Sequence, residues 1–178
     1  MTKNRCTWAN SENIYIRYHD EEWGVPTHDD DELFEMLVLE SFQAGLSWIT
    51  ILKKRENFRK AFDDFDVVKV AGYGEEKINE LLENAGIIRH KGKITSAINN
   101  ARIFIAIQEE FGSFDEYIWG FTDGEIIKAE FLTESELSKK ISKDLKKRGM
   151  KFVGPTIIYS YLESIGIIDN HQECCYKY

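Results

Sequence analysis

Four side chains that commonly bind metal ions lie near the two ends of the sequence. Cys6 precedes His19 by thirteen residues, and His171 precedes Cys175 by four. Two cysteines and two histidines form a common type of closed tetrahedral zinc site. On a helix, His171 and Cys175 would share one face and could bind the same ion. The set predicts a structural Zn²⁺ that joins the N-terminal segment to the C-terminal segment.

Two alternatives stay open for these residues. Cys174 lies three residues after His171 and can reach the same helix face, so it competes with Cys175. Cys6 can also be an ordinary buried thiol without a metal. The odd number of cysteines, three in all, argues against a framework of disulfides.

A carboxylate stands among apolar residues in the stretch LFEMLVLESFQAGLSW, which begins at Leu33. On a helical projection Glu40 falls in the same narrow arc as Leu33, Met36 and Leu37, whereas two other glutamates fall on the opposite side. A buried carboxylate is costly unless it has partners, so Glu40 is a candidate functional residue. A purely structural Glu40, paired with a buried arginine or with backbone, is the alternative.

Aromatic residues crowd the same part of the chain, within the first 48 residues: Trp8, Tyr15, Tyr18, Trp23 and Trp48. Aromatic rings attract cations and stack on flat bases, and a carboxylate accepts hydrogen bonds from an exocyclic amine. Together with Glu40 they could bind a planar, electron-poor base. Ordinary core packing is the alternative for each ring.

A glycine-containing turn, KFVGPT (151–156), separates two expected helices and follows a lysine-rich stretch. Such a turn at the start of a helix presents backbone N–H groups to an anion such as phosphate. The candidate phosphate-contacting residues in this turn are Lys151, Val153, Gly154 and Thr156.

Helices must position these groups, because helical patterns cover most of the chain and strand-like alternation is scarce. Stop signals and apolar spacing predict helices at about 29–43, 47–62, 75–84 and 93–111. A capping box at Thr133–Glu136 predicts the start of another helix, and Pro155 predicts the start of the last. The sequence predicts an all-α protein, a single compact helical domain over residues 1–178.

The composition fits a packed domain, with 43% hydrophobic residues and a net charge of −8. Because no apolar run is long enough to span a membrane and no secretory signal is evident, we expect a cytosolic protein. The acidic total lowers the expectation of nucleic-acid binding, but basic residues concentrate at 53–60, 89–93 and 139–151. They either form one basic face or are separate solvated helix surfaces.

The chain closely resembles the DNA-3-methyladenine glycosylase I family of the helix-hairpin-helix glycosylase superfamily, over essentially its whole length. The run QAGLSWITILKKRE is the most specific part of the resemblance. The matching stretches are RCTWA (5–9), YIRYHDEEWGVP (15–26), LFEMLVLESFQAGLSWITILKKRENFRKAFDDFD (33–66), NAGIIRHKGKI (84–94), KKRGMKFVGPTIIYSYLESIG (146–166), DNH and the closing CCY.

The resemblance implies a monofunctional glycosylase that removes N3-methyladenine from alkylated double-stranded DNA by hydrolysing the N-glycosidic bond. It implies a structural zinc at Cys6, His19, His171 and Cys175, with Cys174 outside the site. It places the five aromatic residues and Glu40 in the base pocket. Leu46 would fill the gap left by the flipped base, and the 151–156 turn would be the hairpin that contacts DNA. We expect a monomer that releases free 3-methyladenine.

Two other functions stay open: a zinc-containing helical module that binds damaged DNA without catalysis, and a nucleosidase acting on free nucleosides. The basic stretch at 139–151 argues against the nucleosidase, which needs no DNA contact.

Overall fold

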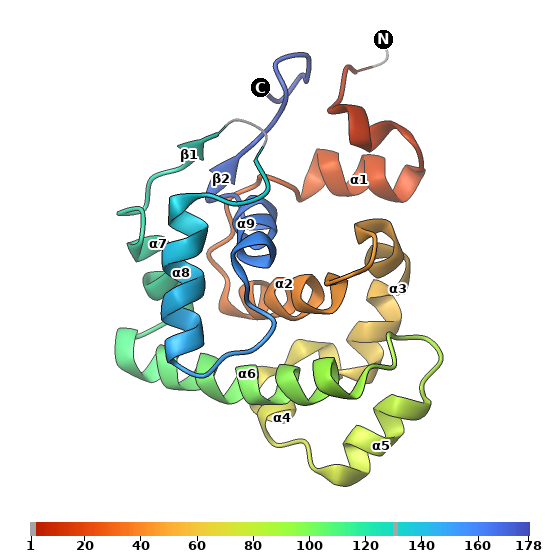
Figure 1. Cartoon of the computed structure of the whole chain (residues 1–178). Helices are drawn as coiled ribbons and strands as arrows, with labels where there is room; N and C mark the ends of the chain where they lie inside the picture. The colour runs from red at the N-terminus through yellow and green to blue at the C-terminus, as the bar shows by residue number, and fades with distance from the viewer. Residues whose placement is uncertain (1–2, 130–131) are drawn as a thin grey trace.

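The structure, a computed structural model, describes residues 3–129 and 132–178 as one compact group of packed helices (Figure 1). Its helices and 3₁₀ turns are η1 (Thr7–Asn10), α1 (Asn13–Glu21), α2 (Asp30–Gln43), α3 (Trp48–Ala61), η2 (Asp63–Phe65), α4 (Val67–Ala71), α5 (Glu75–Glu83), α6 (Lys91–Phe111), α7 (Phe114–Gly120), α8 (Glu136–Lys147) and α9 (Pro155–Ser164). The short strands β1 (Ile127–Lys128) and β2 (Ile168–Asp169) pair in parallel. The predicted helical architecture is confirmed. No helix within the described ranges has the length and apolar character needed to cross a membrane.

Helix α2 lies in the middle of the molecule and packs against α3, α6 and α9 (Figure 1). It begins after Asp29, whose carboxylate accepts hydrogen bonds from the N–H groups of Asp31 and Glu32 at 3.0 and 3.1 Å. Nearly every residue from Leu33 to Phe42 is buried, so the apolar surface is wider than the predicted arc. Helices on several sides cover α2, and Glu40 is therefore buried as expected.

The carboxyl end of α2 is held by a buried lysine from another helix. Lys93, in the first turn of α6, donates from Nζ to the backbone oxygens of Phe42 and Ala44 at 2.8 and 2.6 Å. The last carbonyl groups of a helix have no partner within the helix, and a cation there also suits the helix dipole. Lys93 thus caps α2 and joins it to α6.

Two glycines allow the segment after α1 to pack against the end of α9. Gly24 has a φ of +73°, and a Cβ at this position would lie 2.6 Å from Cε1 of His171. Gly166 has a φ of +81°, and a Cβ there would collide with the backbone of Val25 and Pro26. Any other residue would be strained in this backbone region and would also clash.

Helices α8 and α9 lie side by side and are joined by residues 148–154 (Figure 1). The predicted capping box at Thr133–Glu136 is wrong by two residues. The side chain of Ser135 caps α8 instead, and Oγ of Ser138 accepts a hydrogen bond from the N–H of Ser135 at 2.8 Å. The expected start of α9 at Pro155 is confirmed.

Replacing Lys93 with methionine should lower the free energy of unfolding by about 2 kcal/mol. The substitution keeps the apolar stem but leaves the carbonyl groups of Phe42 and Ala44 without their donor. Urea unfolding measures the change, and Lys91→Met, at an exposed position of the same helix turn, is the matched control. Equal stability of the two variants would contradict the capping role.

Candidate functional site

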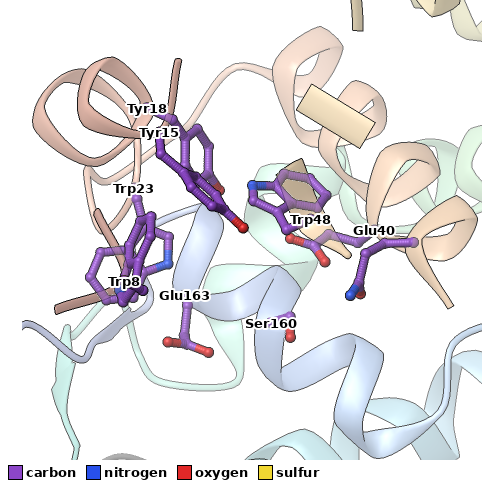
Figure 2. Close-up of a pocket in the computed structure, with 9 residues that line it drawn as sticks. Trp8, Tyr15, Tyr18, Trp23, Glu40, Trp48, Ser160 and Glu163 are labelled. Carbon is purple, nitrogen blue, oxygen red and sulfur yellow. The ribbon is translucent and has the colours of Figure 1, made fainter. Parts of the chain in front are cut away.

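A cavity of about 180 Å³ opens between α1, α2, α3 and α9. Its wall is formed by Trp8, Tyr15, Tyr18, Trp23, Glu40, Gln43, Trp48, Ser160 and Glu163 (Figure 2). All five aromatic residues and the glutamate that the sequence singled out lie around it. Its flat aromatic rings and few polar groups suit a small planar molecule.

The aromatic residues form two connected groups around the cavity. Trp8 makes edge-to-face contacts with Tyr15 and Trp23, with ring centroids 5.3 and 5.0 Å apart. Tyr18 and Trp48 form the second group at 5.6 Å. Helix α1 presents Tyr15 and Tyr18 one turn apart, as their spacing predicts. Such fixed rings provide flat faces for stacking.

Glu40 is only 3% exposed, and its side chain lies in the cavity wall beside Trp48 (Figure 2). Burial raises the pKa of its carboxyl well above the usual range, and the negative charge of Glu163 raises this pKa further. Nε1 of Trp48 is a buried donor without a hydrogen-bond partner among the described residues. The wall thus holds both an acceptor and a donor available to a guest.

Sequence reasoning missed three residues of the wall: Gln43, Ser160 and Glu163. Gln43 lies one helical turn after Glu40, and Ser160 and Glu163 lie one turn apart on α9. Polar residues at this spacing within the otherwise apolar stretch 157–165 were a usable signal.

Burial raises the pKa of the Glu163 carboxyl to about 7. Its Oε2 accepts a hydrogen bond from Nδ2 of Asn170 at 3.2 Å, which offsets part of that effect. The cavity therefore contains two carboxyl groups, one from α2 and one from α9, that are both harder to ionise than in water.

Next to the cavity, three potential metal ligands come together. Side-chain ligand atoms of Cys6, His19 and Cys175 all lie within 4.8 Å of one another, and all three residues are buried. Such a group could hold a metal ion. Exposed Cys174 points elsewhere, with its sulfur 4.0 Å from Oε1 of Gln172.

His171 lies beside this group, and its ring centroid is 5.3 Å from that of His19. On a helix His171 and Cys175 would share one face, but residues 170–178 form turns and irregular structure rather than a helix. Turns after β2 place each of the two residues beside His19 instead, and Asn170 and Gln172 bond to neighbouring segments. Nε2 of His171 is buried and has no hydrogen-bond partner in the described part of the chain.

Both histidines are oriented by carboxylates. Nδ1 of His19 lies 2.9 Å from Asp20, and Nδ1 of His171 lies 2.7 Å from Asp169, which leaves each Nε2 for the interior. Burial lowers the pKa of both imidazoles, which favours the neutral form that binds metals. Carboxylates in this position are typical partners of metal-binding histidines.

The cysteine–histidine group also supports the aromatic wall. The ring of Trp8 lies 5.4 Å from that of His19, and Trp23 lies 4.7 Å from His171. Two of the five aromatic residues are therefore packed between the cavity and the potential metal ligands.

Hydrogen bonds from side chains of α2, α6 and α8 fix the backbone of the turn between α8 and α9. Its carbonyl groups at Lys151, Phe152 and Val153 accept hydrogen bonds from Asn100, Ser41 and Ser142 at 2.8, 3.1 and 2.6 Å. Val153 is buried, while Lys151 and Thr156 are exposed. Gly154 precedes Pro155 at the start of α9. The N–H of Lys151 also bonds inward, to Oδ1 of Asn100 at 3.0 Å, so the N–H groups that this loop can present outward are those that follow Lys151.

Leu46 lies in the turn between α2 and α3 and is 37% exposed. The turn is tight, because Gln43 bonds to Leu46 through its backbone oxygen and its side chain, at 2.7 and 2.8 Å. Ser47 is the N-cap residue of α3, but its hydroxyl contacts that of Thr50 at 2.7 Å rather than the backbone.

The chain is thus an α-helical protein with a cavity lined by aromatic residues and carboxyl groups, bordered by a potential metal site. A family model described as methyladenine glycosylase matches residues 8–178. The chain belongs to this family.

Known proteins of this kind are similar over nearly their whole length. DNA-3-methyladenine glycosylase 1 of Escherichia coli (strain K12) is 47% identical over 97% of this chain and 96% of the relative. A crystal structure of 3-methyladenine DNA glycosylase I superposes with a TM-score of 0.93, at 46% identity over 97% and 98% of the two chains. A structure of a variant of 3-methyladenine DNA glycosylase I in complex with 3-methyladenine also superposes with a TM-score of 0.93, at 35% identity over 97% of this chain and 96% of that chain.

Proposed function

We propose that this protein is a DNA glycosylase that hydrolyses the N-glycosidic bond of N3-methyladenine in alkylated DNA. The cavity carries this proposal: aromatic residues surround a space for one base, and Glu40 lies in its wall. The named activity of the relatives and the 3-methyladenine bound to one of them support the same substrate.

Methylation at N3 places a positive charge on the base before reaction, and this charge makes the base a good leaving group. When the bond between the sugar and N9 breaks, the electron pair stays with the base, which departs as neutral 3-methyladenine. The sugar passes through an oxocarbenium-like state, water adds to C1′, and a proton is released. The protein therefore needs little acid catalysis and mainly has to select the base and hold it.

The base must leave the DNA stack to reach the cavity. Tyr18 and Trp48 would stack on it, and the carboxylate of Glu40 would accept a hydrogen bond from its amino group. A cationic base beside Glu40 would lower the pKa of that carboxyl and favour the ionised form. The ionised Glu40 would in turn attract the positive charge that develops on the sugar.

For the DNA contact, we propose that α8, the loop and α9 form the helix-hairpin-helix motif. Lys151, Val153, Gly154 and Thr156 would lie along one phosphate backbone, with the N–H groups of the loop and of the first turn of α9 facing the phosphates. Exposed Leu46 would occupy the space that the flipped base vacates.

We further propose that Zn²⁺ joins the two ends of this single domain, residues 1–178. Two thiols and two imidazoles are a donor set that suits tetrahedral zinc, and His171 offers an otherwise unpaired buried nitrogen. Cys6, His19, His171 and Cys175 would hold the ion, whose charge would favour the thiolate form of both cysteines. Zinc would supply folding stability and no chemical step.

Replacing Glu40 with glutamine should slow release of 3-methyladenine from methylated DNA by about 10²-fold, because the shape is kept and the charge is lost. Chromatography of the released bases under single-turnover conditions measures the rate. Glu76→Gln, at an exposed position of α5, is the control. Unchanged release in Glu40→Gln would contradict an electrostatic role.

DNA binding without release by the unaltered protein would favour the damage-binding module, and release from free nucleosides only would favour the nucleosidase.

Replacing Cys6 with serine should abolish stoichiometric zinc and lower the free energy of unfolding by about 3 kcal/mol or more. Cys174→Ser is a matched control at an exposed thiol and should leave both unchanged. Metal analysis of the purified proteins and thermal unfolding give the two results. Full zinc content in Cys6→Ser, or its loss in Cys174→Ser, would show that the ligand set is different.

Replacing Lys151 with alanine should weaken binding to DNA of any sequence and reduce the slope of log K against log salt concentration by about 1. Fluorescence anisotropy over a series of salt concentrations measures the slope. Lys60→Ala, at an exposed lysine of α3, should not change it. An identical slope for both variants would show that Lys151 does not contact a phosphate.

A further inference from the structure

The charges of the cavity wall are one-sided. Glu40 and Glu163 contribute carboxyl groups, and among the residues that the structure describes no lysine or arginine lines the cavity. The two acids are close enough for the charge of Glu163 to raise the pKa of Glu40. A bound cation would therefore compensate the negative charge of this wall, whereas a neutral base would not.

Glu163 is well placed to act on such a guest. It lies one turn after Ser160 on the face of α9 that borders the cavity, across from the aromatic residues of α1 (Figure 2). The backbone around it is fixed, because its carbonyl oxygen accepts a hydrogen bond from the N–H of Gly24 at 3.0 Å. Asn170 binds its Oε2 at 3.2 Å. The carboxyl group is thus held in position without an ion pair that would neutralise it.

We propose that Glu163 is a specificity-determining residue, a second carboxylate that selects positively charged alkylated bases over neutral ones. This inference rests on the proposed glycosylase function and assigns a role to a residue of α9 in the same cavity. Glu40 would bind the amino group of the base directly, and Glu163 would act mainly through its charge on the ring.

Such a charge would also distinguish the substrate from the product. The base is cationic while it is attached to the sugar and becomes neutral when the bond breaks, because it keeps the electron pair. Attraction to Glu163 is then lost at the moment of cleavage. The second acid would favour binding of the damaged nucleotide and would not retain the free base.

A structural role is the competing explanation, since the bond from Asn170 to Glu163 links α9 to the segment that carries His171. Glutamine at position 163 keeps the length and can still accept the hydrogen bond from Asn170. Aspartate keeps the charge and shortens the side chain. The two substitutions therefore separate charge from shape.

The experiment compares the binding of two small probes by quenching of tryptophan fluorescence, at mildly alkaline pH. One probe is 3,9-dimethyladeninium, a fixed cation, and the other is neutral 3-methyladenine. Glu163→Gln should reduce the preference for the cation on the order of tenfold, the effect of one partly screened charge pair. Glu163→Asp should keep most of the preference, and Glu76→Gln should keep all of it.

An equal loss of affinity for both probes in Glu163→Gln would overturn the proposal and assign a structural role to the residue. An unchanged preference in Glu163→Gln would overturn it as well, as would a preference lost equally in Glu163→Asp. Thermal unfolding of each variant verifies that the protein is folded, and Glu163→Asp alone decides between charge and shape if Glu163→Gln is unfolded. Base release from methylated DNA by the unaltered protein tests the glycosylase function separately, because the preference between probes does not depend on turnover.

Discussion

The contact between the N-terminal and C-terminal segments determines where the aromatic wall of the cavity lies. Helix α1 contributes two tyrosines to this wall, yet only Tyr18 and His19 of its nine residues are buried. Core packing alone therefore holds it weakly. His19 contacts Cys175 at 3.4 Å, and an ion pair between Arg55 and Glu22 at 2.6 Å fixes the end of α1 to α3. Because Trp8 and Trp23 pack against the histidines, any change in the cysteine–histidine group alters the cavity as well.

The polar groups of the cavity wall lower the stability of the folded protein. Among the described residues, Glu40 is buried and Glu163 half-buried with no lysine or arginine in the cavity wall, and the indole N–H of Trp48 has no acceptor. Each of these groups lowers the stability of the protein without a guest, and each is a possible partner for a charged base. Raised pKa values limit the cost, since the acids of the empty cavity can take up protons instead of repelling each other. Functional sites commonly carry local energetic costs of this kind.

Local patterns predicted the helices well and the contacts between distant segments less well. The acids before Leu33 and the proline at position 155 set the starts of α2 and α9 as expected. The pairing of His171 with Cys175 was expected on a helix face, but turns fixed by contacts with the N-terminal segment place these residues. Glu163 was not predicted, although its spacing from Ser160 on an apolar helix is the same kind of signal as that of Glu40. Tertiary packing alone decided the positions of His171 and Cys175, and no local pattern contains it.

Helix α6 has no residue in the cavity, yet it sets the distance between the two surfaces proposed to contact DNA. Lys93 holds the backbone before Leu46, and Asn100 holds both backbone groups of Lys151, at 2.8 and 3.0 Å. Seven residues make two turns, so both side chains project from the same face of α6, about 10 Å apart along its axis. A straight helix is stiff over this length. The turn at Leu46 and the loop at Lys151 therefore cannot move independently, and a strand of DNA held at one of them is held in register with the other.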